Sequence, residues 1–146
     1  METATNLVAS RIVSLNRTVY QNLTAQTTTS LTPVVAATIT ITPRITGRVK
    51  VHSVTRANNN TVGDGITVSL YMGTTLIDSH TYTQEGLAGN SVNFVMEYDT
   101  GMYPNGVLQD SGSLAIGVPV TFNLEIEAVT GGTVTYKTLM LSAEEY

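Results

Sequence analysis

The chain has 146 residues, the size of one ordinary domain with a single hydrophobic core. It has no cysteine and only two histidines, which excludes disulfides, thiolate metal sites and imidazole clusters, so neither a metal nor another cofactor is expected. A net charge of -4 opposes binding to nucleic acid, and we expect neither a signal peptide nor a membrane span, because no cationic leader and no long apolar stretch is present.

Charged residues make up 12% of the chain, against about a quarter in typical soluble domains. Threonine, asparagine, serine and glycine take their place, and threonine favours strands while it presents a hydroxyl to water. A surface so poor in charge protects a free monomer only weakly from association. The composition therefore suggests that part of the surface is covered in an assembly.

Residues 5–15 are the first element in chain order and fit either a short helix or an arm. Leu7 and Ile12 fall near one face of that helix and are candidate interface residues. A threonine-rich stretch then joins this segment to the body. We expect a single domain in two parts, with an N-terminal arm and first strand over residues 1–30 and a β-sandwich body over residues 31–146.

Apolar and polar residues alternate through most of the remaining sequence, which is the pattern of half-buried β-strands. Within residues 65–73, for example, Ile66, Val68 and Leu70 fall on one face and hydroxyl residues on the other. Glycine and asparagine, which tolerate positive φ, separate the segments. About eight strands without a long helix predict an all-β fold, an antiparallel sandwich or barrel. The predicted strands cover residues 18–27, 34–43, 47–54, 65–73, 74–83, 91–98, 119–129 and 132–141.

The last two strands are predicted to form a hairpin, and its register decides which side chains reach the core. A two-residue turn would place the Lys137 ammonium on the core face, which is costly. We therefore prefer a three-residue loop over 131–133, because it pairs apolar residues inside the sheet. The resulting inward pairs are Ala128 with Tyr136, Ile126 with Thr138 and Leu124 with Met140.

This register leaves Leu139 and Leu141 on the outer face of the sheet, beside Glu125 and Asn123. Two exposed leucines on one strand are explained most easily if another subunit or the N-terminal arm covers them, so these four residues are interface candidates. A β-bulge near Thr138 is the alternative, and it would return both leucines to the core.

The tripeptide Asp99-Thr100-Gly101 matches the segment that carries the catalytic carboxylate of aspartic proteases. Such an enzyme needs two aspartates that share one proton, one from each lobe or subunit. Here Glu97 and Tyr98 stand where the dimeric enzymes have apolar residues. A strand-ending turn, with Asp99 bonded to nearby backbone N–H groups and Gly101 at positive φ, fits better. No catalytic residue is assigned, and a dimeric aspartic protease is the third function considered.

Arg48, Lys50 and His52 share one face of a predicted strand and are candidates for docking an acidic surface or an anionic glycan. A solvated strand face is the simpler interpretation. The loop 58–65 carries Asp64 and several asparagines, but calcium takes about six to eight oxygen ligands and needs more carboxylates than this loop offers. No metal site is therefore assigned.

Three segments in this order resemble a known group of proteins: "TVYQNLTAQTTTSLTPVVAATITITPRITGRVKVHSVTRANNN", "GITVSLYMGTTLIDSHTYT" and "GVPVTFNLEIEAVTGGTVTY". They are similar to the small jelly-roll domains of bacteriophage tail-fibre, head-fibre and decoration proteins, which are loosely like the heads of tumour necrosis factor and C1q. The resemblance covers roughly residues 18–142. It implies a jelly-roll-like β-sandwich, a homotrimer around a three-fold axis and no catalytic residues. The collagen-like or coiled-coil stalk of many fibre proteins is missing, which favours a compact module bound to the virion.

We therefore expect a non-enzymatic structural protein of a virion, a capsid decoration or a head- or tail-fibre subunit, that assembles with itself. Its expected partners are copies of itself, a major capsid or tail protein, and a host surface glycan. The alternative is a carbohydrate-binding sandwich module in which Tyr98 and Tyr103 stack on sugar rings. The lack of tryptophan weakens this alternative.

Overall fold

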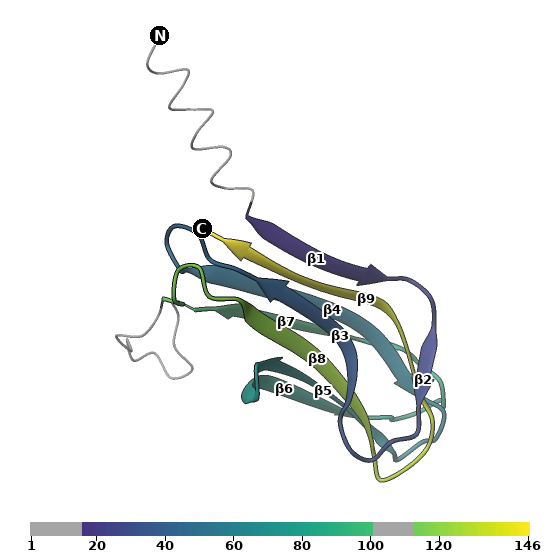
Figure 1. The fold of residues 1–146 in the computed structure, drawn as a ribbon. Coiled ribbons are helices and arrows are strands. Elements are labelled where there is room, and N and C mark those ends of the chain that lie inside the picture. Colours follow the sequence, from purple (N-terminus) through teal and green to yellow (C-terminus); the bar gives the residue numbers. More distant parts are fainter. Residues whose placement is uncertain (1–15, 101–112) are drawn as a thin grey trace.

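The computed structural model describes residues 16–100 and 113–146. Within them, nine strands form two antiparallel sheets that pack face to face (Figure 1). Sheet A has the order β1-β9-β4-β7, with β2 also paired to β9, and sheet B has the order β3-β8-β5-β6. None of these residues forms a helix with the length and apolarity needed to cross a bilayer. The strands are β1 Arg17–Asn22, β2 Gln26–Thr28, β3 Val34–Ile41, β4 Val49–Asn59, β5 Gly65–Met72, β6 Thr75–Thr83, β7 Val92–Asp99, β8 Val120–Val129 and β9 Val134–Glu145.

Alternation makes one face of each sheet apolar, and the two apolar faces meet in the core. In β4 the odd-numbered residues are buried and the even-numbered residues face outward. In β8 the even-numbered Phe122, Leu124 and Ile126 are fully buried. The core therefore lies between the sheets and is densest at their central strands.

The chain crosses from one sheet to the other at most of its connections. Strands β3 and β4, β4 and β5, β6 and β7, β7 and β8, and β8 and β9 lie in opposite sheets, whereas β5 and β6 form a hairpin within sheet B. This alternation between two sheets is the arrangement of a jelly roll. The predicted all-β, antiparallel, jelly-roll-like sandwich is confirmed. The arm or short helix predicted at the N-terminus, with Leu7 and Ile12, lies outside the described residues.

The predicted hairpin of the last two strands is wrong. Strand β8 pairs with β3 and β5 in sheet B, while β9 pairs with β1, β2 and β4 in sheet A. Ala128 and Tyr136 are both buried, but they belong to opposite sheets, and the other two predicted pairs fail in the same way. Strands that face each other across a core show the same apolar pattern as strands that pair within one sheet, so alternation alone did not separate the two cases.

The outward placement of Leu139 and Leu141 is also wrong, because their exposures are 2% and 0%. The pairing of β9 with β4 shifts between Val54 and Arg56, so that residues 138–139 of β9 lie opposite a single residue of β4. This β-bulge reverses the alternation, and the odd-numbered residues of β9 point inward beyond it. The alternative interpretation, a bulge near Thr138 that buries both leucines, is the correct one.

A buried carboxylate fixes the end of β9. Glu145 is 4% exposed and accepts hydrogen bonds of 2.7–3.1 Å from the backbone N–H groups of residues 44–47, and another from the Asn16 side chain. Burial by itself raises the pKa of Glu145, but these donors outweigh burial and lower the pKa to about 2. The negative charge of Glu145 therefore ties the loop between β3 and β4 to the C-terminal strand.

The same loop approaches the segment before β8 at Gly47. This residue has a φ of 69°, and a Cβ at this position would lie 2.2 Å from the backbone oxygen of Leu114. The Leu114 N–H donates to the Gly47 carbonyl at 2.7 Å. Only glycine allows this close contact between two backbones.

A second polar network closes the sandwich at the opposite end of β4. Asn59 is fully buried, and its side-chain amide donates to the carbonyl groups of Gly65 and Gly131 at 3.1 Å each. The buried Gln84 accepts the Asn59 N–H at 3.2 Å and donates to the Leu87 carbonyl at 2.9 Å. The side-chain amides of Asn59 and Gln84 thus provide hydrogen-bond partners for backbone groups of the loops at this end of the sandwich.

Candidate interaction surfaces

The outer face of sheet A carries an apolar row at its centre, which consists of Met140 of β9, Val54 of β4 and Val95 of β7. These residues lie in register on adjacent strands, and Val95 at the edge is 50% exposed. Val19 of β1, also on this face, is 49% exposed. Apolar side chains that form a continuous strip, instead of scattered single residues, are typical of surfaces that contact another protein.

Charged residues flank the apolar row along the strands in both directions. In one direction a set of charges alternates in sign across strands β1, β9, β4 and β7. In the other direction two cations are paired in register. The alternating set is Arg17, Glu144, Lys50 and Asp99, and the cationic pair is Lys137 and Arg56. An apolar centre with a charged rim is the general composition of a protein interface.

The predicted basic stripe lies on this face, but carboxylates and an aromatic ring share it. The Lys50 Nζ atom lies 4.6 Å from the centre of the Tyr146 ring, and the His52 Nε2 atom lies 3.8 Å from a carboxylate oxygen of Glu97. Arg48 is exposed just before β4 begins. The face is therefore mixed in charge, and docking of an anionic partner on these three residues stays a prediction.

The outer face of sheet B is rich in hydroxyl groups and also carries the carboxylates of Glu125 and Glu127. Neighbouring strands exchange side-chain hydrogen bonds of 2.9–3.0 Å between Thr38 and Asn123, Thr40 and Thr121, Thr67 and Thr81, and Ser69 and Ser79. Asn123 and Glu125 belong to this face, whereas the leucines predicted beside them are in the core of the molecule. The predicted four-residue interface is therefore not formed, and sheet A offers the more apolar contact surface.

An edge cleft of about 940 Å³ opens beside β6 and β7, the edge strands of the two sheets. Tyr98, one of the two predicted stacking residues, lines this cleft, and the other, Tyr103, lies outside the described residues. Burial and the charge of Asp99 raise the pKa of Tyr98, so its hydroxyl stays protonated at neutral pH and can donate a hydrogen bond. The other lining residues are Lys50, Val51, His52, Met72, Thr75, Leu76, Ile77, Asp78, Glu97 and Asp99.

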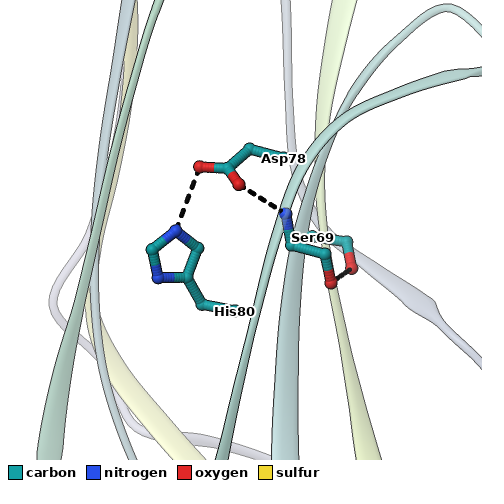
Figure 2. A network of polar contacts seen from close by, with 4 residues as sticks. Ser69, Asp78 and His80 are labelled. Atoms are coloured by element: carbon teal, nitrogen blue, oxygen red, sulfur yellow. Dashed lines mark hydrogen bonds and ion pairs between the residues drawn. The ribbon is translucent and has the colours of Figure 1, made fainter. Parts of the chain in front are cut away.

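Asp78 lines the cleft, and two contacts hold its carboxylate in place (Figure 2). One carboxylate oxygen lies 3.0 Å from His80 Nε2, and the other accepts the backbone N–H of Ser79 at 2.8 Å. Asp78 and His80 share the core-facing side of β6, because they pair with the buried Leu70 and Val68. Their side chains are nevertheless 39% and 49% exposed, since the sandwich is open at this edge.

The two serines near this pair do not complete a Ser-His-Asp arrangement. Ser79 stands between Asp78 and His80 in β6 and therefore points to the opposite face. Its hydroxyl bonds to that of Ser69 at 2.9 Å, on the outer face of sheet B (Figure 2). A nucleophilic serine needs a hydrogen bond to its histidine, and this geometry separates them.

The segment that resembles a protease motif ends a strand. Asp99 is the last residue of β7 and accepts a hydrogen bond from the Tyr146 hydroxyl. Thr100 follows in a turn, and its side-chain oxygen accepts the Val49 N–H at 2.9 Å. In register on β4, Asp99 faces Lys50 and not a second carboxylate. Gly101 lies outside the described residues.

Asp64, the residue considered for calcium, binds a neighbouring loop. It accepts a hydrogen bond from the Thr130 hydroxyl at 2.7 Å, which connects the β4–β5 loop to the β8–β9 connection. Across residues 16–100 and 113–146, no three histidine, aspartate or glutamate side chains gather as a metal site. Asp64 thus has a structural role in joining two loops.

Comparison with known proteins finds similarity in structure only. No family model and no curated protein matches the sequence. The fold is similar to VP2 of infectious bursal disease virus in a subviral particle, with a TM-score of 0.55, 11% identity and coverage of 91% of this chain and 34% of that chain. Particles of T=1 symmetry derived from the same virus give a TM-score of 0.55, 13% identity and coverage of 91% and 32%. This chain spans about a third of the length of these viral proteins, and the likeness shows a jelly-roll β-sandwich fold.

A sugar-binding protein, the C-terminal domain of EclA, is a weaker match. The TM-score is 0.48 at 13% identity, with coverage of 82% of this chain and 77% of that chain. A score at this level carries no argument about function.

The sequence analysis missed most of the cleft residues. In the sequence, Asp78 and His80 alternate with hydroxyl residues, and this pattern is typical of an ordinary exposed strand. Charged residues on the core-facing side of a strand are a signal of a sheet edge, where they also oppose pairing with a second sheet. That signal becomes visible only when the register with Leu70 and Val68 is known.

Proposed function

We propose that the chain is a non-enzymatic structural subunit of a virion, of the bacteriophage type that decorates a capsid or forms a head- or tail-fibre appendage. It assembles with copies of itself, as a homotrimer, and attaches to a major capsid or tail protein. Subunits associate by burying surface against one another, and the apolar row of sheet A is the surface used for self-assembly.

The observation that carries this proposal is the strip of Met140, Val54 and Val95 on a jelly roll, an architecture that is common in viral capsid domains. A low charge content and a charged rim around the strip support it. The trimer and the phage-type particle rest on the sequence resemblance. Lack of enzymatic activity is supported by the separation of Ser79 from His80 on opposite faces of β6.

Light scattering coupled to size exclusion tests the proposal through two matched variants. Val95 and Val35 are both exposed valines, at 50% and 57%, on the outer faces of edge strands, β7 in sheet A and β3 in sheet B. We expect the wild type and Val35→Lys to elute as a trimer, and Val95→Lys to shift to monomer because it puts an ammonium into the apolar row. Neither substitution should change the melting temperature of the folded single subunit.

A wild-type protein that stays monomeric at 100 µM, or a Val95→Lys variant that assembles as the wild type does, would contradict self-assembly through sheet A. A stable dimer in place of a trimer would retain the surface and overturn the three-fold arrangement. Addition of purified tail or capsid protein, followed by co-elution, tests attachment to the particle.

Carbohydrate binding is a second candidate function. The edge cleft beside Tyr98 favours it, because it combines an aromatic ring with three carboxylates, those of Asp78, Glu97 and Asp99. It shares Lys50 and Asp99 with the charged rim of sheet A, but its aromatic and aliphatic lining lies outside the apolar row used for self-assembly, so one subunit can carry both surfaces.

A further inference from the structure

We propose that the edge cleft between β6 and β7 binds a neutral hexopyranose unit of a glycan, with the Tyr98 ring as its platform and Asp78 as its fixed hydrogen-bond acceptor. This inference rests on the second candidate function above, names the ligand class of that cleft, and is tested separately from self-assembly.

The size and lining of the cleft fit such a ligand. Its volume of about 940 Å³ holds a short oligosaccharide. Tyr98, Met72 and Ile77 are half-buried and line it from both sheets, with Leu76 at 52% exposure. Pyranose rings present a face of C–H groups that packs on an aromatic or aliphatic surface, while their hydroxyl groups point to the rim.

The polar groups of the cleft are mostly hydrogen-bond acceptors. Three carboxylates, those of Asp78, Glu97 and Asp99, line it beside the single ammonium of Lys50. An anionic ligand is disfavoured by this balance, whereas the hydroxyl groups of a neutral sugar can each donate to a carboxylate in a charge-assisted hydrogen bond. The protonated Tyr98 hydroxyl adds a donor for a sugar oxygen.

Asp78 is the best-oriented of these acceptors. The His80 ring and the Ser79 N–H hold its carboxylate at 3.0 Å and 2.8 Å, so little side-chain freedom is lost when a ligand binds. His80 is not a lining residue of the cleft and acts through Asp78 as a positioning residue. Figure 2 shows the imidazole directed at the aspartate oxygen.

Saturation-transfer NMR with the intact protein tests the site. The probes are the methyl glycosides of glucose, galactose, mannose and N-acetylglucosamine at 10 mM each, followed by titration of any binder. We expect at least one to bind with a dissociation constant of about 1 mM, as a ligand of this size allows. Asp78→Asn should weaken binding at least tenfold, because the amide keeps the shape and loses the charge.

Two tyrosine variants supply the matched control. Tyr98 and Tyr82 are both half-buried against the core, but only Tyr98 lines the cleft. Tyr98→Leu should abolish sugar binding, and Tyr82→Leu should preserve it at a comparable loss of melting temperature. His80→Gln should weaken binding less than Asp78→Asn does.

Absence of saturation transfer for all four glycosides would overturn the proposal. So would binding that survives both Asp78→Asn and Tyr98→Leu. A preference for the methyl glycoside of glucosamine, titrated as a fifth probe, over that of glucose by more than tenfold would also overturn it, because the cleft would then select a cation. None of these results bears on self-assembly, which the Val95→Lys variant tests by itself.

Discussion

Two buried threonines of sheet A, one within β4 and one directly after β7, differ in what their hydroxyl groups contact. Thr100 is 5% exposed and accepts a hydrogen bond from the Val49 N–H at 2.9 Å. Thr55, on the core side of β4, is 1% exposed, and its hydroxyl has no hydrogen-bond partner among the described residues. Ser53, two positions earlier, shares this condition. Burial of a hydroxyl without a hydrogen-bond partner lowers the free energy of unfolding, whereas a hydrogen bond offsets the cost of removing the hydroxyl from water.

The same substitution should therefore have opposite results at the two positions. Thr55→Val keeps the shape and removes the unpaired hydroxyl, so the free energy of unfolding should stay unchanged or rise by about 1 kcal/mol. Thr100→Val leaves the Val49 N–H unpaired and should lower it by about 1–2 kcal/mol. Urea denaturation measures both. Equal losses for the two variants would mean that the Thr55 hydroxyl has a hydrogen-bond partner in solution, such as a trapped water.

Glu145 gives the fold a specific dependence on pH. Its carboxylate accepts N–H groups from residues 44–47, and its pKa falls from 4.5 to about 2 in the folded state. A group whose pKa is lowered by folding stabilises the protein above its unfolded pKa and loses that contribution as the pH falls toward its folded pKa. The contribution of Glu145 should thus be complete above about pH 5 and decline between pH 4.5 and 2.

Glu145→Gln isolates this contribution. The amide oxygen can accept fewer of the loop N–H groups, and its NH₂ group faces other donors, so the free energy of unfolding at pH 7 should fall by about 2–3 kcal/mol. The difference between wild type and variant should shrink as the pH falls from 4.5 to 2, which thermal denaturation at a series of pH values measures. A difference that stays constant over this range would show that the carboxylate charge is not what holds the loop.

At the level of strands, the bulge in β9 decides which residues form the core of sheet A. Before it, Val134 and Tyr136 point inward, and after it Leu139, Leu141 and Ala143 do. One inserted residue is the only way to keep both groups buried on a strand with a side-chain period of two. The register of the whole C-terminal half of β9 therefore depends on a single residue.

Deletion of Thr138 should disrupt the fold. Without the extra residue, one half of β9 must turn its apolar side chains to the outer face or lose its pairing with β4. We expect a loss of more than about 4 kcal/mol, or a chain without cooperative unfolding by circular dichroism. Thr138→Ala, which keeps the backbone residue, should cost much less. A deletion variant with wild-type stability would mean that β9 can slip without penalty.

Local patterns were sufficient to predict individual strands, and insufficient to predict how they are distributed between sheets. Residues 65–73 and 119–129 were predicted as strands from alternation and are observed as Gly65–Met72 and Val120–Val129. The pairing of β9 with β1, β2 and β4, and not with β8, depends on contacts between segments far apart in the chain. The same limit applies to the cleft. Tyr98 can be singled out in the sequence as an aromatic residue, but Asp78 lines the cleft only because the edge strands of the two sheets lie side by side.

On the scale of the molecule, the outer faces of the two sheets differ in chemistry. Sheet B pairs its own hydroxyl groups across strands on a polar face that includes Glu125 and Glu127. Sheet A exposes valines within a charged rim. A jelly roll has two such faces and an open edge, so the apolar row of sheet A and the Tyr98 side of the β6–β7 cleft occupy different parts of the surface, which meet at Lys50 and Asp99.

The same topology governs how fast the molecule folds. The first and last strands pair along Arg17 with Glu144, and the central strand of sheet A comes from the C-terminus, so the sheet is incomplete until the ends of the chain have met. Closing such long loops precedes most of the stabilising contacts, which slows folding. We expect refolding from urea on a timescale of about 10 ms to several seconds. Since the chain has seven tyrosines and no tryptophan, stopped-flow tyrosine fluorescence is the suitable probe. Refolding within microseconds would be incompatible with a sandwich built from such distant pairings.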